Sequence, residues 1–132
     1  MNSKKMIVAA LAGLLALVGA ASLRAQSGGF RFFGPLSRVV TPNGDSINDR
    51  FFICYDNFSD SGVSGRVYTL LGAEVASMTP VRSPLAGCAP GTLAQHAWWN
   101  GRTSEGAVRS GIYVYRIEAE GKTYAGTFLV VR

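Results

Sequence analysis

The sequence predicts an all-β protein, folded as an antiparallel sandwich of about seven short strands. Runs of β-branched and aromatic residues recur along the chain, and turn-forming residues separate them at intervals typical of a sandwich. No window after residue 25 has the apolar spacing of an amphipathic helix. The last third of the chain alternates most clearly, because Tyr113, Tyr115 and Ile117 fall on one face of a strand.

Residues 1–25 are predicted to be a cleavable signal peptide. Lys4 and Lys5 precede an apolar run, and small residues suited to signal-peptidase cleavage follow it. Several positions between Ala20 and Gln26 have the small residues that signal peptidase requires before its cleavage site. A retained membrane anchor is the alternative, but the apolar run is shorter than the roughly 20 residues that span a bilayer. We therefore expect an exported protein, at the cell surface or extracellular, that meets the membrane only through its export signal.

The charge of the chain is nearly balanced once the leader is removed. The whole sequence has 13 Lys and Arg against 8 Asp and Glu, and Lys4, Lys5 and Arg24 belong to the leader, so 10 minus 8 leaves +2. No run of basic residues stands out, and a nucleic-acid partner is not expected. The remaining residues suffice for one domain. We assign 26–38 to an N-terminal segment or edge strand and 39–132 to the sandwich.

The N-terminal segment is rich in glycine and phenylalanine, with Phe30, Phe32 and Phe33 placed around Arg31. Exposed phenylalanines at a free terminus are costly. The segment is therefore expected either to cover its own domain as an edge strand or to insert into a neighbouring molecule.

Residues 41–49, T-P-N-G-D-S-I-N-D, predict an ordered corner before the first central strand at 51–55. Proline restricts φ, glycine adopts conformations closed to other residues, and Asn or Asp side chains bond neighbouring backbone N–H groups. The residues of this turn motif are Pro42, Asn43, Gly44, Asp45, Asn48 and Asp49.

The corner could also hold calcium. Asp45 and Asp49 would supply carboxylate oxygens, but Ile47 occupies a position where the EF-hand pattern needs an oxygen ligand. The alternative is a corner held by its own side-chain hydrogen bonds. No other cofactor is expected.

The middle of the chain predicts a tight hairpin and then a long loop. Strands at 66–71 and 74–78 flank Gly72-Ala73, which reads as a two-residue turn. Residues 79–95 contain three prolines and two glycines, which disfavours a central strand. A loop of this length needs a tether.

Cys54 and Cys88 are the only cysteines. In an exported chain they are predicted to form a disulfide, which would stabilise the fold by roughly 3 to 4 kcal/mol. Two free thiols are the alternative. Together with the lone His96, the cysteines are too few for structural zinc.

The final strands are predicted at 97–99, 112–119 and 122–131, with a turn-rich connection at 100–111 and a two-residue turn at Glu120-Gly121. Adjacent strand residues face opposite ways. Trp99 is expected in the core. Trp98 then lies on the outer face, where it either is shielded by a loop or forms a contact surface.

No catalytic constellation stands out. His96 has no orienting carboxylate beside it, and no G-x-S-x-G motif is present. The sequence does not indicate an enzyme.

Four blocks of the sequence resemble the gliding-motility-associated C-terminal domains, which are type B sorting domains of the type IX secretion system. The block at 67–75 is also similar to related type A sorting domains, and the block that begins at Trp99 is also similar to the immunoglobulin-like domain of flagellar hook-capping proteins. The blocks are T-P-N-G-D-S-I-N-D at 41–49, V-Y-T-L-L-G-A-E-V at 67–75, W-N-G at 99–101 with Gly106 and S-G-I-Y-V-Y at 110–115, and G-T-F-L-V-V-R at 126–132.

The resemblance implies an immunoglobulin-like sandwich and a surface setting. It also implies a core motif of Trp99, Gly101, Gly111, Tyr113 and Tyr115. Ser46 stands where the family usually has glycine, and Asn100 where it has aspartate.

Three functions follow as hypotheses. The first is a non-enzymatic module that acts at the cell surface through protein contacts, in sorting, attachment or assembly. The second is a subunit of an extracellular filament, in which Phe30, Phe32 and Phe33 dock on the next copy. The third is a carbohydrate-binding module that uses Trp98.

Overall fold

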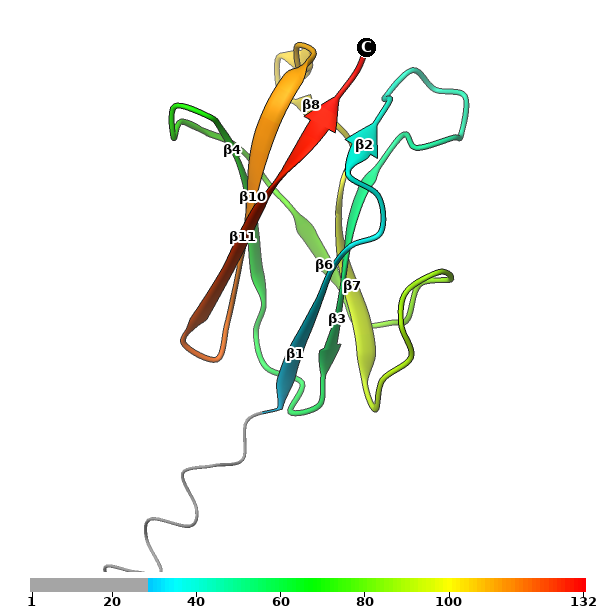
Figure 1. Cartoon of the computed structure of the whole chain (residues 1–132), viewed down its shortest axis with the longest axis vertical. Coiled ribbons are helices and arrows are strands. Elements are labelled where there is room, and N and C mark those ends of the chain that lie inside the picture. Colours follow the sequence, from blue (N-terminus) through cyan, green and yellow to red (C-terminus); the bar gives the residue numbers. More distant parts are fainter. Residues whose placement is uncertain (1–28) are drawn as a thin grey trace, which may run out of the picture.

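The computed structural model describes residues 29–132, and it confirms the all-β sandwich. The signal peptide expected at 1–25 lies outside these residues. Two sheets face each other, and the C-terminus lies at the end of the domain opposite the start of β1 (Figure 1). Within the described part of the chain, no helix is long and apolar enough to cross a membrane.

Residues 29–132 form eleven strands, more than the seven or so expected, because several short segments also pair. The strands are β1 (Phe30–Pro35), β2 (Val39–Val40), β3 (Phe51–Asn57), β4 (Ser64–Thr69), β5 (Glu74–Ser77), β6 (Thr79–Val81), β7 (Ala94–Trp99), β8 (Arg102–Thr103), β9 (Gly106–Ala107), β10 (Gly111–Ala119) and β11 (Lys122–Val130). One sheet has the order β1-β3-β7-β6 and the other β2-β11-β10-β4-β5, while β8 and β9 form a small hairpin.

The core lies between the two larger sheets. Phe51 of β3 stacks on Phe128 of β11 with ring centroids 3.8 Å apart. Tyr113, Tyr115 and Ile117 point inward from β10 and are at most 8% exposed, as the alternation predicted. Burial of these large apolar side chains provides most of the driving force for folding.

The N-terminal segment forms the edge strand β1, which pairs with β3. Phe30 and Phe32 pack against the core, and Phe32 stacks on Tyr124 with centroids 4.8 Å apart. Phe33 points the other way and lies under Arg31, whose Cζ is 5.4 Å from the ring centroid. The chain then changes sheets, because β2 pairs in parallel with the end of β11.

The prediction of a two-residue turn between β4 and β5 is wrong. The connection comprises the four residues from Leu70 to Ala73. The ladder between β4 and β5 ends at Thr69. The Thr69 carbonyl accepts a hydrogen bond from the Gly72 N–H at 3.0 Å, and its Oγ1 accepts one from the Ala73 N–H at 3.2 Å. Leu70 and Leu71, which the sequence placed in a strand, are consequently 61% and 98% exposed.

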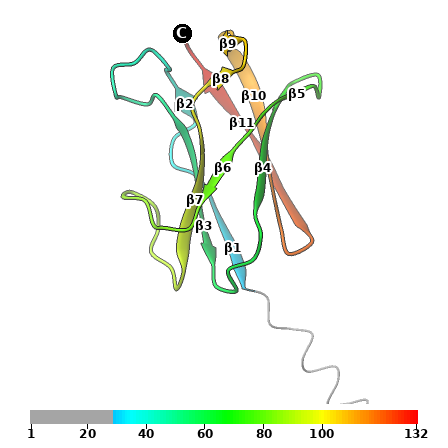
Figure 2. The ribbon, with the colours of Figure 1, turned by 180° about the vertical axis from the view of Figure 1, so that it is seen from behind.

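The region expected to be one loop, 79–95, contains two strand segments. The chain leaves the second sheet after β5, buries Met78, and joins the first sheet as β6. Pro80 is tolerated there because β6 is the edge of its sheet. A loop follows until β7 begins at Ala94, earlier than the predicted residue 97. The sheet change at Met78 is the step that alternation alone did not reveal (Figure 2).

Candidate functional site

The four sequence blocks that are far apart in the chain meet at one end of the sandwich. The corner precedes β3, the turn at 70–73 follows β4, the segment at 100–109 follows β7, and the C-terminus follows β11. All of these lie at the end where the C-terminus is drawn (Figures 1 and 2). We call residues 41–49, 70–73, 100–109 and 131–132 the motif end.

Asp49 is the centre of the corner. Its Oδ1 accepts hydrogen bonds from the N–H groups of Asn43 at 3.2 Å and Gly44 at 3.0 Å. Its Oδ2 accepts from the N–H of Ser46 at 2.7 Å. One carboxylate thus satisfies three backbone donors of an exposed loop, which fixes the shape of the loop.

The other side chains of the corner bond in the same local manner. Asn43 Oδ1 accepts from the Asp45 N–H at 3.1 Å, and Asp45 Oδ1 accepts from the Ile47 N–H at 2.9 Å. Thr41 Oγ1 donates to the carbonyl of Ile47 at 3.1 Å. Within residues 29–132, no group of three or more His, Cys, Asp or Glu side chains is arranged to hold a metal. Asp45 and Asp49, the carboxylates suggested for calcium, accept hydrogen bonds from backbone N–H groups of the corner.

Ser46 adopts φ of 66°, in the left-handed region that favours glycine. This explains the family's glycine at the position. Ser46→Gly is expected to raise the free energy of unfolding by about 1 kcal/mol, measured by urea denaturation. Ser104→Gly is the matched control in an exposed turn without positive φ, where we expect a small loss of stability. A loss in both variants would contradict the assignment of strain to Ser46.

Gly101 joins the corner to the end of β7. A Cβ at this glycine would lie 3.0 Å from the Cβ and Cγ of Pro42, and its φ is +74°. Only glycine therefore lets the Pro42 ring pack against the chain here. At the C-terminus, the N–H of Arg132 donates to Ser110 Oγ at 2.9 Å. These contacts connect the first block to the third and the third to the last.

The two neighbouring tryptophans lie on opposite faces of β7. Trp99 is 3% exposed in the core, and its Nε1 donates to the carbonyl of Arg102 at 3.0 Å. Trp98 is half-buried on the outer face, where the Arg50 guanidinium lies over its ring, with Cζ 4.5 Å from the centroid. Arg50 therefore shields much of the ring face that a sugar would need.

Arg50 and Arg102 were not singled out by the sequence. Both line a shallow hollow of about 200 Å³ beneath the corner, together with Asn100. The sequence did contain a signal, because Arg50 immediately precedes β3 and lies two residues from Phe52, so the two side chains point to the same outer face. The pairing of Phe52 with Trp98 on β7 then places Arg50 beside the tryptophan.

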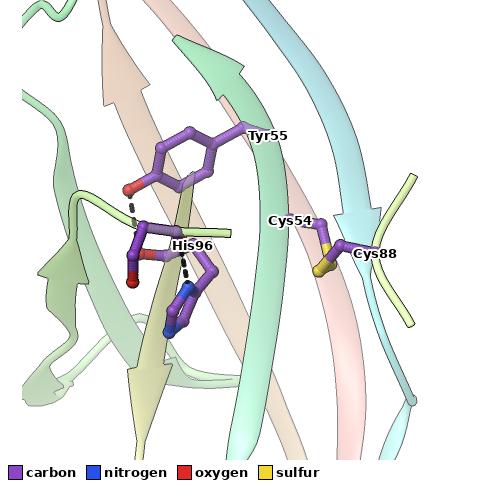
Figure 3. Close-up of a disulfide and its surroundings, with 5 residues drawn as sticks. Cys54, Tyr55, Cys88 and His96 are labelled. Atoms are coloured by element: carbon purple, nitrogen blue, oxygen red, sulfur yellow. Dashed lines mark hydrogen bonds between the residues drawn. A yellow bond between two sulfur atoms is a disulfide. The ribbon is translucent and has the colours of Figure 1, made fainter. Parts of the chain in front are cut away.

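Cys54 and Cys88 form the predicted disulfide, with Cα atoms 5.7 Å apart. It holds the loop after β6 against the outer face of the first sheet (Figure 3). His96, 7% exposed, lies under the same loop, and its Nδ1 lies 2.8 Å from the carbonyl of Ser83. Because a carbonyl only accepts, Nδ1 carries the proton. His96 thus anchors the loop.

Tyr55 lies on the inner side of β3 and is 1% exposed. Its hydroxyl donates to the carbonyl of His96 at 3.2 Å (Figure 3). Burial raises the pKa of this hydroxyl from 10.0 to about 12.

The raised pKa of Tyr55 predicts a loss of stability in alkali. Between about pH 10 and about pH 12 the unfolded chain binds fewer protons than the folded chain, so this contribution is complete below pH 10 and falls as the pH rises. The total loss is about 2 to 3 kcal/mol. Urea denaturation across this interval measures it, and Tyr55→Phe should flatten the slope. An unchanged slope in Tyr55→Phe would assign the effect to other groups.

One of the comparisons with known proteins identifies a family. The family model described as the CHU_C type IX secretion signal domain matches residues 35–131, which include the whole motif end except Arg132. This family is not an enzymatic one. No curated protein and no solved structure matches the chain. The protein is exported, to the cell surface or the extracellular space, and it belongs to the CHU_C type IX secretion signal domain family.

Proposed function

We propose that the domain is a non-enzymatic sorting and attachment module that presents its motif end to the secretion machinery and to surface proteins. The observation that carries the proposal is the convergence of the four family blocks at one end of the sandwich. The strand residues of these blocks supply core side chains, and this packing role is enough to explain why the family has them. The exposed turn residues of these blocks supply no core side chains, and a recognition role accounts for their position.

The exposed side chains of the motif end suit protein contact. Ile47 at the corner is 66% exposed, and Leu70 and Leu71 at the turn between β4 and β5 are 61% and 98% exposed. Large apolar side chains on rigid turns lose little conformational freedom on binding and bury much apolar surface. They favour a protein partner.

The two alternative functions gain less support. Phe30 and Phe32 already pack against the core of their own domain, so docking on a next copy would first have to break those contacts. Trp98 is covered by Arg50, so sugar stacking would have to displace a guanidinium. Surface sorting requires neither change.

The test is export of the full chain in cells that have a type IX secretion system. The variant carries Ile47→Ser, Leu70→Ser and Leu71→Ser, and the control carries Phe58→Ser and Leu93→Ser at the opposite end, where both side chains are also exposed. We expect the variant to lose surface protein, measured by protease accessibility on intact cells, while the control keeps it. Equal export of folded variant and folded control would contradict the proposal.

A further inference from the structure

Two arginines without carboxylate partners face one hollow at the motif end. Arg50 and Arg102 are exposed, and both line the hollow beside Asn100. Within residues 29–132, every ion pair involves other arginines. Neither guanidinium is therefore neutralised by a carboxylate at ion-pair distance.

The hollow is lined by one carboxylate, which already accepts hydrogen bonds from the corner. Asp49 also lines the hollow, but its Oδ1 and Oδ2 accept three backbone hydrogen bonds from the corner. Two guanidinium groups and one carboxylate thus leave a net charge of +1 at the hollow. The hollow has hydrogen-bond donors to spare and an excess of positive charge, which suits an anion.

The Arg50 side chain and the Arg102 backbone are held in place by neighbours that are not acidic. The Arg50 guanidinium rests on Trp98, with Cζ 4.5 Å from the ring centroid. The backbone of Arg102 is fixed on two sides, because its carbonyl accepts from Trp99 Nε1 and its N–H donates to Asn100 Oδ1, each at 3.0 Å. A site that is already ordered loses less entropy on binding.

A second hollow shares Asn100 and Arg102 with the first, so the two lie next to each other. Its other wall includes Ser77 of β5 and Thr79 of β6, and these strands are the edges of their sheets. Edge strands leave one row of backbone groups unpaired, and an extended peptide can pair with such a row. The wall therefore favours an extended protein segment as the ligand.

We propose that this pair of hollows binds an extended acidic segment of a partner protein, with a carboxylate side chain placed between Arg50 and Arg102. The inference rests on the proposed function, in which the motif end acts by protein contact, and it adds the chemistry of the partner. Asn100 lies between the two hollows and offers its amide N–H₂ group to the same ligand.

The experiment titrates the purified exported protein with a synthetic peptide of alternating glycine and glutamate, followed by isothermal calorimetry. A glycine–glutamine peptide of equal length and polygalacturonate are the other two arms. We expect the glutamate peptide to bind about 10-fold or more tightly than the glutamine peptide, with affinity falling as salt rises. No preference for glutamate overturns the proposal. Binding of polygalacturonate in place of the peptide also overturns it, since the ligand is then a glycan.

Arginine variants locate the site. Arg50→Gln and Arg102→Gln should each weaken the glutamate peptide about 10-fold. Arg31→Gln is the matched control, because Arg31 also lies over an aromatic ring but belongs to β1. Equal weakening in all three variants overturns the proposal, as does an unchanged affinity in both Arg50→Gln and Arg102→Gln.

The peptide titration and the export test can succeed or fail independently of each other. If the peptide binds as expected while the motif-end variant is still exported, the proposed function fails and the acidic ligand stands. If export depends on the motif end but the peptide does not bind, the acidic ligand alone fails.

Discussion

Trp99→Ala is expected to lower the free energy of unfolding by about 3 to 5 kcal/mol. The indole is 3% exposed and packs edge-on against Phe128, with ring centroids 6.0 Å apart. Its Nε1 also donates to the carbonyl of Arg102, and alanine would leave that acceptor unpaired. The variant therefore loses a large buried apolar surface and a hydrogen bond, and it leaves a cavity in the core. Urea denaturation with two-state analysis measures the loss.

Trp98→Ala is the control for this prediction. The two residues are neighbours of the same type, but Trp98 is half-buried on the outer face. Its replacement removes the contact with Arg50, and we expect a loss of about 1 kcal/mol. Equal losses in the two variants would show that the face assignment of β7 is wrong.

Replacing both Cys54 and Cys88 by alanine is expected to lower the free energy of unfolding by about 3 to 4 kcal/mol. The bond joins residues 34 apart in sequence, so its loss frees a long loop in the unfolded chain. The same loop is anchored to His96 through Ser83, and we expect faster proteolysis between β6 and β7.

Reductant provides the matching measurement. Added to the wild-type protein, it should reproduce the loss, and added to the double-alanine variant it should have no effect. A reductant effect smaller than about 1 kcal/mol would mean that the disulfide constrains the unfolded chain far less than its loop length implies.

Parts of the fold that depend on local pattern could be predicted from the sequence. The hairpin of β10 and β11 was found because its strands alternate and Glu120-Gly121 suits a tight turn. Both turn residues have positive φ, at 52° and 73°, as such a turn requires. The corner at 41–49 could also be predicted from local pattern, since its hydrogen bonds join residues at most seven positions apart.

The features that were missed depend on pairing across the molecule. A two-residue strand such as β2 has no periodicity, and only its partner β11 defines it. The sequence around Leu70 reads as a strand, but the hydrogen bonds of Thr69 end the ladder first. The hollow with Arg50 and Arg102 arises because β3 and β7 pair, and no local pattern shows which strands will be neighbours.

If the motif end is the surface that partners contact, a photo-crosslinking residue placed there should capture a partner protein. A crosslinking residue at position 47 samples the motif end, and one at position 58 samples the opposite end. The two positions are similarly accessible, because Ile47 is 66% exposed and Phe58 is 63% exposed. In living cells, we expect Ile47 to crosslink to a protein of the cell envelope and Phe58 to give no such product. Crosslinks from Phe58 without any from Ile47 would contradict the claim.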